Sequence, residues 1–390
     1  MLPTQSLKEH VAILAFPFGS HDLTILRLAC RLARAAPNVQ FSFLTTAKSN
    51  DSIFSTFKLD VPNNIRAYNV EDGVPANDVF SGNPVERLDP FLKATPANFQ
   101  KGLDVAVIYG RGHASLSDMV VVTKMVANSN QTLEVIPGLS PMHVRHSKET
   151  FFSYILSKIG CVLPRSTAIV MNFCQELYPT ALFDDLKSMF PALLNVGFFT
   201  QELPLPPLPP SDSDATECLS WLDKQSSKSV EYISFGTAAT PAGLELKALA
   251  EAVEERGIPY LWCLKDDHKH HLPNGFIRRI SKQGKLVSTG VFVTHCGANS
   301  VFESVANGVP MICRPMFGVH WRMDVWWRKY GELVLRVEGD VFTKSGVLKS
   351  LKIVLGQEHG KQMRERIRTL KELVLKATEP STSASQDFKT

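Results

Sequence analysis

The segment 291–320 constrains the fold of this chain more than any other part of the sequence. It opens with the apolar run 291–293, which is typical of a buried parallel strand. Asn299 is placed to cap the helix that follows, Gly308 ends that helix, and residues 309–313 indicate the next strand. A strand, a turn of small residues and a helix N-terminus in this order present backbone N–H groups to an anion. The segment therefore predicts a parallel α/β sheet with a pyrophosphate site at the end of a strand.

Two side chains extend this predicted anion site. His295 ends the strand and can donate a hydrogen bond to a phosphate, and Glu303, about one turn into the helix, can accept hydrogen bonds from ribose hydroxyls. The competing interpretation is an ordinary strand-helix unit of a doubly wound sheet, in which His295 is only a turn residue.

The order of these residues carries a family resemblance. Residues 295–304 read HCGANSVFES and are followed by Gly-Val-Pro and Pro-Met-Phe, and this pattern resembles the signature box of plant UDP-dependent glycosyltransferases. The resemblance implies a GT-B architecture, an α/β fold of two doubly wound Rossmann-like domains that face each other across a cleft. It further implies that His295, Asn299 and Ser300 hold the diphosphate and that Glu303 holds the ribose. The full set of UDP-sugar-binding candidates is Ser234, Thr237, Cys263, His295, Gly297, Asn299, Ser300, Glu303 and His320.

Three of these candidates come from other parts of the same domain. Ser234 and Thr237 lie at the end of a predicted strand and can bind phosphate oxygens through their hydroxyls and backbone N–H groups. Cys263 matches a position that borders the uridine in the family. His320 stands where glutamine ends the signature box, a difference that the family associates with UDP-galactose rather than UDP-glucose.

Length and apolar patterning predict the domain organisation. A chain of 390 residues exceeds the usual size of one domain, so two domains with separate cores are expected. We place a shortened N-terminal acceptor-binding Rossmann-like domain at 1–202, a proline-rich linker at 203–215 and a C-terminal UDP-sugar-binding Rossmann-like domain at 216–390. The linker indicates a stiff spacer, with a ligand for an SH3-type domain as the alternative. Predicted strands are 10–16, 39–45, 168–173, 193–198, 230–235, 260–264, 291–293 and 309–313, and predicted helices are 23–35, 151–163, 217–225, 244–256, 347–355 and 361–376.

Composition excludes several other classes of protein. The net charge of +4 is too weak and too evenly spread to indicate binding to nucleic acid. Seven cysteines without a Cys-x-x-Cys pair suit reduced thiols in the cytoplasm rather than a disulfide framework or a zinc site. The cluster His268, His270 and His271 is interpreted as a coincidence in a polar loop, and no metal or cofactor besides the UDP-sugar is expected. Neither a signal peptide nor a membrane-spanning run is recognisable, so a cytoplasmic protein is expected. We expect it to be a monomer.

A histidine stands at the corresponding edge of the predicted first domain. Residues 10–16 indicate a strand, and His21 follows that strand after the turn 17–20. Because α/β folds bind ligands at the carboxyl ends of their strands, His21 is placed to act as a general base, with a purely local role at a helix N-terminus as the alternative. In the plant glycosyltransferases the histidine of this Phe-Pro-Phe-x-x-His turn deprotonates the acceptor hydroxyl. The resemblance thus implies catalysis by His21 and acceptor binding by Phe18 and Ser20.

The resemblance also implies a carboxylate partner for His21, because an aspartate that fixes the imidazole tautomer improves a general base. In relatives this aspartate ends a strand, and here the surrounding segment is shorter by several dozen residues. Asp118 is the best remaining candidate, with an exposed loop aspartate as the alternative interpretation. Asp104 is a weaker candidate, and Asp22 is expected to face away from His21.

The second domain lacks part of the family pattern as well. Relatives carry a Trp-Ala-Pro-Gln turn before the strand 291–293, where the tryptophan stacks on the uracil, and this chain has no such turn. Ala298 replaces a tryptophan, and Val319 replaces the aspartate that holds the sugar hydroxyls. Loss of base stacking costs on the order of 1–3 kcal/mol of binding free energy.

These features predict UDP-sugar-dependent, inverting transfer of a hexose, galactose or glucose, to the 3-hydroxyl of a flavonol or anthocyanidin. The acceptor follows from similarity to flavonoid 3-O-glycosyltransferases at residues 49–54 and 65–75. The alternative is a truncated, inactive paralogue that at most binds nucleotide or flavonoid weakly. A dinucleotide-dependent oxidoreductase is excluded, because no Gly-x-Gly-x-x-Gly follows the first strand of either domain.

Overall fold

The structure is a computed structural model, and it describes the chain from residue 9 to residue 390 except for 19–20, 57–59, 75–84, 111–162, 164–165, 191, 200–220, 222–223, 227, 237–239, 277–288, 317–318 and 329–331. The described residues form two compact units. The first unit takes those up to residue 123 and within 165–169, and the second takes those within 124–164 and from 170 onward. Among the helices of the described residues, none combines the length and the apolar character needed to cross a bilayer.

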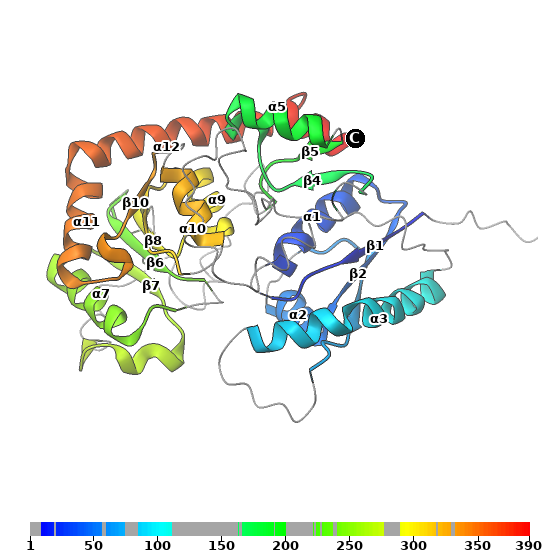
Figure 1. Ribbon diagram of the computed structural model, residues 1–390, viewed down its shortest axis with the longest axis horizontal. Helices are drawn as coiled ribbons and strands as arrows, with labels where there is room; N and C mark the ends of the chain where they lie inside the picture. The colour runs from blue at the N-terminus through cyan, green and yellow to red at the C-terminus, as the bar shows by residue number, and fades with distance from the viewer. Residues whose placement is uncertain are drawn as a thin grey trace, which may run out of the picture. The chain divides into compact units, whose positions relative to one another are not determined.

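The first unit is built on a parallel three-stranded sheet in the order β1–β2–β3 (Figure 1). Its strands are β1 (His10–Leu14), β2 (Gln40–Thr46) and β3 (Ile65–Val70). Helix α1 (His21–Ala35) packs its apolar residues against one face of this sheet, and α3 (Val85–Gly110) packs against the other face. Both faces of a parallel sheet are thereby buried, as this architecture requires. Short helical segments follow β2, namely α2 (Ala47–Asp51) and a π-helical turn (Ser52–Thr56).

The strand-helix-strand opening of the chain is confirmed, whereas β3 and α3 were not predicted. Helix α3 contains Pro90 and Pro96, and proline ordinarily ends a helix because it lacks an N–H group. Two contacts support the helix across these prolines. Thr95 Oγ1 donates a 2.5 Å hydrogen bond to the carbonyl oxygen of Phe91, and the rings of Phe91 and Phe99 are buried against the sheet. Burial of this apolar face outweighs the local signal of the prolines.

The second unit contains a parallel five-stranded sheet in the order β10–β9–β8–β6–β7. Its strands are β6 (Val230–Ser234), β7 (Tyr260–Cys263), β8 (Thr289–Thr294), β9 (Met311–Cys313) and β10 (Val334–Arg336). The chain runs from β6 to β7 on one side and returns to β8 on the other side of β6. The strand order therefore reverses between β6 and β8, and open α/β sheets bind their ligands outside the carboxyl ends of strands at such a reversal.

Helices cover both faces of the five-stranded sheet (Figure 1). On one face, α7 (Gly243–Arg256) and α11 (Lys344–Gly356) contribute buried apolar residues to a core shared with β6 and β8. On the other face lie α9 (Ala298–Asn307) and α10 (Val319–Trp326). Those predicted strands and helices of this domain that fall on described residues thus occur at the expected places, with ends that differ by a few residues, whereas the predicted helix 217–225 lies largely outside the described residues.

A smaller sheet pairs β4 (Ile169–Met171) with β5 (Leu193–Asn195), and α5 (Thr180–Met189) lies between them in the sequence. Aromatic contacts join this region to the second unit. The ring of Phe198 stacks on that of Phe302 in α9 with centroids 4.5 Å apart, and Phe173 lies 5.8 Å from Phe302.

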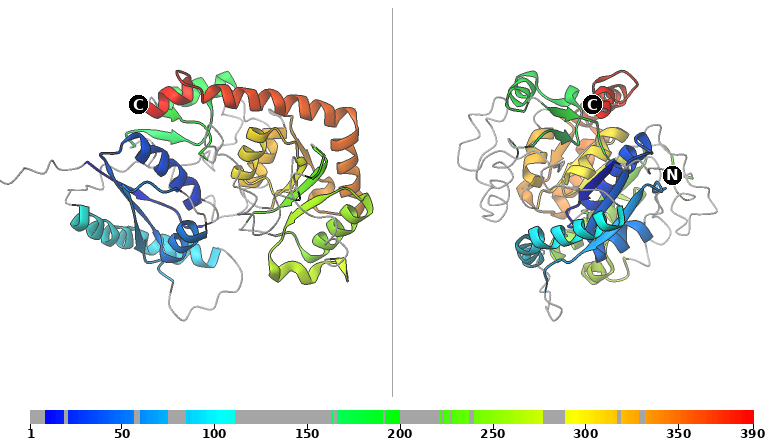
Figure 2. Two further views of the ribbon diagram at one scale, coloured as in Figure 1. Left: turned by 180° about the vertical axis from the view of Figure 1, so that it is seen from behind. Right: turned by 90° about the vertical axis from the view of Figure 1, so that its right-hand side faces the viewer.

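The last two helices reinforce this connection (Figure 2). Helix α12 (Glu358–Ala377) leads from α11 to α13 (Ser383–Lys389), and the backbone N–H of Asn195 donates a 2.6 Å hydrogen bond to Asp387 Oδ2 of α13. Residues 170–199 therefore pack with the second unit, whereas the sequence assigned them to a domain that ends at 202. The linker 203–215 lies outside the described residues, and the domain boundaries stay a prediction.

Candidate functional site

Candidate site residues lie in a row along one edge of the five-stranded sheet, at the carboxyl ends of β6, β7, β8 and β9. The strand register aligns Ser234 with Cys263 on one side and with Thr294 on the other, and it aligns Thr294 with Cys313. The sequence-predicted Ser234, Cys263 and His295 are thereby brought to one edge of one sheet. This edge includes the reversal of strand order between β6 and β8.

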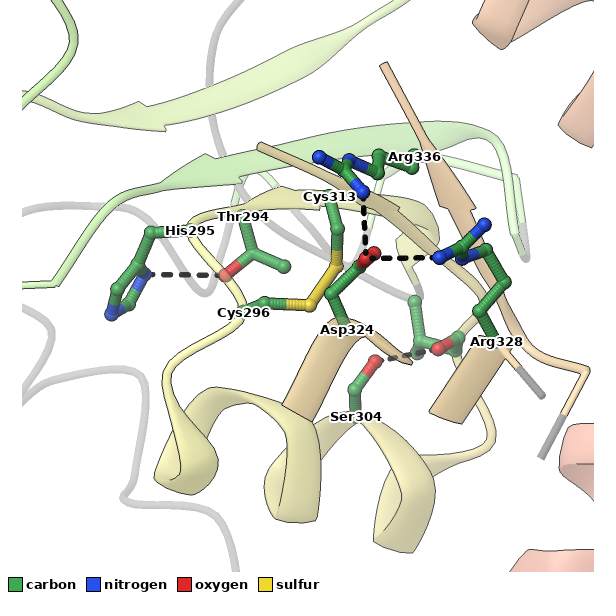
Figure 3. Close-up of a disulfide and its surroundings, with 9 residues drawn as sticks. Thr294, His295, Cys296, Ser304, Cys313, Asp324, Arg328 and Arg336 are labelled. Atoms are coloured by element: carbon green, nitrogen blue, oxygen red, sulfur yellow. Dashed lines mark hydrogen bonds and ion pairs between the residues drawn. A yellow bond between two sulfur atoms is a disulfide. The ribbon is translucent and has the colours of Figure 1, made fainter. Parts of the chain in front are cut away.

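His295 follows β8 directly, and its half-buried ring fills a slot between two glycines. A hydrogen bond of 3.4 Å joins Thr294 Oγ1 and Nδ1 of His295 (Figure 3). A Cβ atom added at Gly236 would lie 2.9 Å from Cε1 of the ring, and one added at Gly297 would overlap Nε2. Gly236 has a φ of +70°, a conformation that glycine adopts at no steric cost. The imidazole thus lies with Nε2 next to the N-cap of α9.

Helix α9 supplies the backbone part of the site. Gly297 is its N-cap, and Asn299 and Ser300 lie half-buried in its first turn. The first N–H groups of a helix have no acceptor within the helix, and they attract anions together with the helix dipole. His295 and the start of α9 can therefore bind a diphosphate and stabilise the negative charge that it gains as a leaving group.

Glu303 and Cys263 lie near one tyrosine. Cys263 Sγ is exposed at the end of β7 and lies 3.5 Å from the hydroxyl of Tyr232. Glu303 is exposed on α9. Burial raises the pKa of the Tyr232 hydroxyl, and the charges of Cys263 and Glu303 raise it further. The residues assigned to uridine and ribose therefore gather around Tyr232.

His320 lies in the first turn of α10 and is buried, with 5% of its surface exposed. Its ring stands almost perpendicular to that of His295, at an angle of 87° and with centroids 4.6 Å apart. The structure thus joins the last residue of the signature box to its first residue.

The prediction that the cysteines are reduced is wrong for one pair, because a disulfide joins Cys296 to Cys313 (Figure 3). The two Cα atoms are 5.6 Å apart, within the usual range for a disulfide. Cys313 ends β9 and pairs with Thr294 of β8, and Cys296 lies two residues after Thr294. The register of the sheet therefore brings the two cysteines together, although their spacing in the sequence does not indicate a disulfide. Among the described residues, Cys30, Cys174 and Cys263 keep reduced thiols, as predicted.

A buried carboxylate lies beside this disulfide. Asp324 is fully buried, and its Oδ2 lies 3.8 Å from a guanidinium nitrogen of Arg328 and of Arg336 (Figure 3). Burial raises its pKa to about 6, although both arginines oppose the shift. Cys296, Cys313 and Asp324 each offer one possible metal ligand within 4.8 Å of the others. The sulfurs are bonded to each other and the carboxylate is paired with two cations, so this cluster is not suited to a metal.

The disulfide predicts a specific mass. Trypsin releases residues 286–322 as one fragment, because the bond after Arg314 precedes a proline and resists cleavage. With the protein alkylated in denaturant before any reductant is added, we expect this fragment to be lighter by two hydrogen atoms and to carry no alkyl group. Reduction before alkylation should add two alkyl groups and serves as the control. Recovery of a fully alkylated fragment without reductant would contradict the pairing, because it would show two free thiols. Free thiols are the usual state of cysteines in a reducing compartment.

In the first unit, His21 is the first residue of α1 and is exposed. An aromatic group lies beside it. The ring of Phe16 contacts His21 edge to face at 5.6 Å, and Phe18 contacts Phe16 at 5.1 Å and Phe91 at 5.4 Å. The sequence indicated Phe18, but it missed Phe91 because α3 was not predicted. A histidine beside aromatic side chains at the carboxyl end of β1 can bind a planar acceptor and take its proton.

The candidate carboxylate partners of His21 have different positions. Asp22 is buried and accepts hydrogen bonds from the Ser49 hydroxyl and from the backbone N–H of Leu23, the latter at 2.7 Å. Burial raises its pKa. Asp104 is exposed on α3 and accepts a 2.9 Å hydrogen bond from Gln100. The preferred candidate Asp118, as well as Ser20 and Thr237, lies outside the described residues.

Comparisons with known proteins agree with this geometry. A model of the family described as UDP-glucoronosyl and UDP-glucosyl transferase matches residues 112–373. A flavonol 3-O-glucosyltransferase from Actinidia chinensis var. chinensis is 40% identical over 97% of this chain and 95% of its own length. An anthocyanidin 3-O-galactosyltransferase from Rhododendron delavayi is 39% identical over 99% of this chain and 97% of its own.

A solved structure extends the likeness to the fold. The crystal structure of a UDP-glucose:anthocyanidin 3-O-glucosyltransferase in complex with UDP has a TM-score of 0.85 and 38% identity, and the match covers 98% of this chain and 97% of the other. The predicted α/β fold of GT-B type is thereby confirmed. The first relative aligns over 445 positions, whereas this chain has 390 residues, so at least 55 aligned positions have no counterpart here. The predicted resemblance to plant flavonoid 3-O-glycosyltransferases is thus confirmed, and so are the predicted internal deletions.

Proposed function

We propose that this chain, which belongs to the UDP-glucoronosyl and UDP-glucosyl transferase family, transfers a hexose from UDP-glucose or UDP-galactose to the 3-hydroxyl of a flavonol or anthocyanidin. One observation carries the donor half of this proposal. The His295 ring lies between Gly236 and Gly297 at the N-terminus of α9, an arrangement that supports diphosphate binding. The acceptor class is inferred from the names of relatives that are 36–40% identical.

The proposed chemistry is a single displacement with inversion at the anomeric carbon. His21 takes the proton of the acceptor hydroxyl while the oxygen attacks the anomeric carbon, and the bond from that carbon to the UDP oxygen breaks. The departing diphosphate gains negative charge, which His295 and the first N–H groups of α9 stabilise. Asn299 and Ser300 would complete the diphosphate site and Glu303 would bind the ribose. In the same proposal, Asp118 is the carboxylate partner of His21, and the reaction needs no metal or cofactor. The protein acts as a monomer in the cytoplasm.

A second function is favoured by one observation, the missing uracil platform. In relatives, the tryptophan of a Trp-Ala-Pro-Gln turn stacks on the uracil. That turn does not precede β8 in this sequence. Loss of this contact weakens UDP binding by about 1–3 kcal/mol, which is roughly a five- to 150-fold rise in Kd. A protein so weakened would bind nucleotide or flavonoid without turnover.

Calorimetric titration with UDP tests the proposal and separates the two functions. We expect UDP to bind to the wild-type protein, and we expect His295→Ala to remove that binding because the variant lacks the side chain next to the α9 N-cap. A turnover assay with a flavonol and each UDP-sugar then follows. Binding with turnover supports the transferase, binding without turnover supports the second function, and a folded wild-type protein that does not bind UDP contradicts the transferase.

A further inference from the structure

The contact between His320 and His295 points to a role for His320 that differs from sugar recognition. In the sequence, His320 is a candidate for contact with the hexose, where it would distinguish galactose from glucose. In the structure its ring packs at 87° against the ring of His295, with centroids 4.6 Å apart, and only 5% of its surface is exposed. A side chain so buried leaves little surface for a sugar hydroxyl, whereas its contact with His295 is already formed.

The surroundings of His295 show what this contact can do. Thr294 holds Nδ1 at 3.4 Å, Gly236 lies against Cε1, and Gly297 lies against Nε2. A larger side chain at Gly236 or Gly297 would clash with the His295 ring. Glycine has no side chain to pack against the ring, so these residues do not by themselves stop the ring from swinging away from α9. His320 supplies an aromatic wall. An edge-to-face aromatic pair contributes about 0.5–1.5 kcal/mol beyond the burial of its surface.

We propose that His320 is a positioning residue that holds the His295 ring toward the diphosphate, so that it sets the affinity for UDP and not the choice between UDP-glucose and UDP-galactose. This inference rests on the proposed function, because it takes the site of His295 and α9 to bind UDP. Val319, which precedes His320 at the start of α10, has no polar side chain with which to bind a sugar hydroxyl.

Two variants of His320 distinguish positioning from sugar recognition, because they should rank in opposite orders. His320→Phe keeps a ring of similar size and loses both nitrogens, whereas His320→Gln keeps polar atoms and loses the ring. For positioning, Gln should raise the Kd for UDP roughly three- to tenfold, and Phe should raise it less. The same ratios should hold for UDP, UDP-glucose and UDP-galactose. For sugar recognition, Gln should bind UDP like the wild type and change the ratio between the two UDP-sugars.

A ligand-free measurement keeps this test separate from the test of the proposed function. In crystals of the ligand-free variants, the His295 ring should lie away from the N-cap of α9 in His320→Gln and beside it in His320→Phe. Thermal unfolding checks that each variant is folded. An unmoved His295 ring in folded His320→Gln, or a changed sugar ratio with unchanged UDP affinity, would overturn the inference even where UDP binds. A folded wild-type protein that does not bind UDP would overturn the proposed function, and with it the effect of His320 on affinity.

Discussion

Replacing His21 with alanine is expected to lower kcat for hexose transfer by about 10²–10⁴-fold, the usual contribution of a general base. The side chain lies at the carboxyl end of β1, exposed at the first residue of α1 and in edge contact with Phe16. A proton must leave the acceptor hydroxyl as its oxygen attacks, and the imidazole is the group that we assign to this step. Initial rates with a saturating UDP-sugar and a flavonol measure the effect.

His10 offers a matched control on the same strand. It lies at the other end of β1, and its Nε2 forms a 2.7 Å hydrogen bond with the Ser42 hydroxyl, away from the edge that carries His21. We expect His10→Ala to keep most of the turnover, and we expect His21→Ala to bind UDP with the wild-type Kd because the diphosphate site belongs to the second unit. The assignment of His21 fails if His21→Ala keeps more than about a tenth of the wild-type kcat.

The strand-turn-helix around His295 was predictable from sequence because each of its features is local. The apolar run of β8 stops at Thr294 and Gly308 ends α9 with a φ of +72°, so propensity and turn chemistry agree. The predicted cap is wrong, because the N-cap is Gly297 and Asn299 lies inside the first turn of α9. The helix α1 was predictable for the same reason, since its apolar residues recur with helical spacing. Sequence reasoning therefore placed the diphosphate site on the correct elements.

The missed features depend on contacts between residues that are distant in sequence. The prolines of α3 indicate helix ends locally, and the helix exists because its aromatic residues are buried against β2 and β3. The disulfide of Cys296 and Cys313 depends on the pairing of β8 with β9, and the contact of His320 with His295 depends on where α10 packs. Such contacts need the strand order of the sheet, which the family resemblance implied only in outline.

Glu231 places an acidic side chain in a buried strand, a conflict that is visible in the sequence. It is the one acidic residue of the predicted strand 230–235, and the structure buries it in β6 with 1% of its surface exposed. Among the described residues, neither carboxylate oxygen has a hydrogen-bond partner. Burial disfavours the charged form and raises the pKa of this carboxyl from 4.5 to about 7, although the charge of Arg256 partly opposes the shift.

The raised pKa of Glu231 makes stability depend on pH in a direction that can be tested. Between pH 4.5 and 7 the folded state holds a proton that the unfolded state releases, so the free energy of unfolding falls as pH rises through this window. The difference between the two pKa values corresponds to about 3 kcal/mol. Glu231→Gln cannot ionise, so its stability relative to the wild type should rise by about this amount from pH 4.5 to above 7, as measured by urea unfolding at each pH. The comparison cancels the titration of Asp324, which both proteins share. Glu365→Gln, on the exposed face of α12, should follow the wild-type curve at every pH. A constant difference between Glu231→Gln and the wild type would show that Glu231 ionises in the folded protein as it does in the unfolded chain.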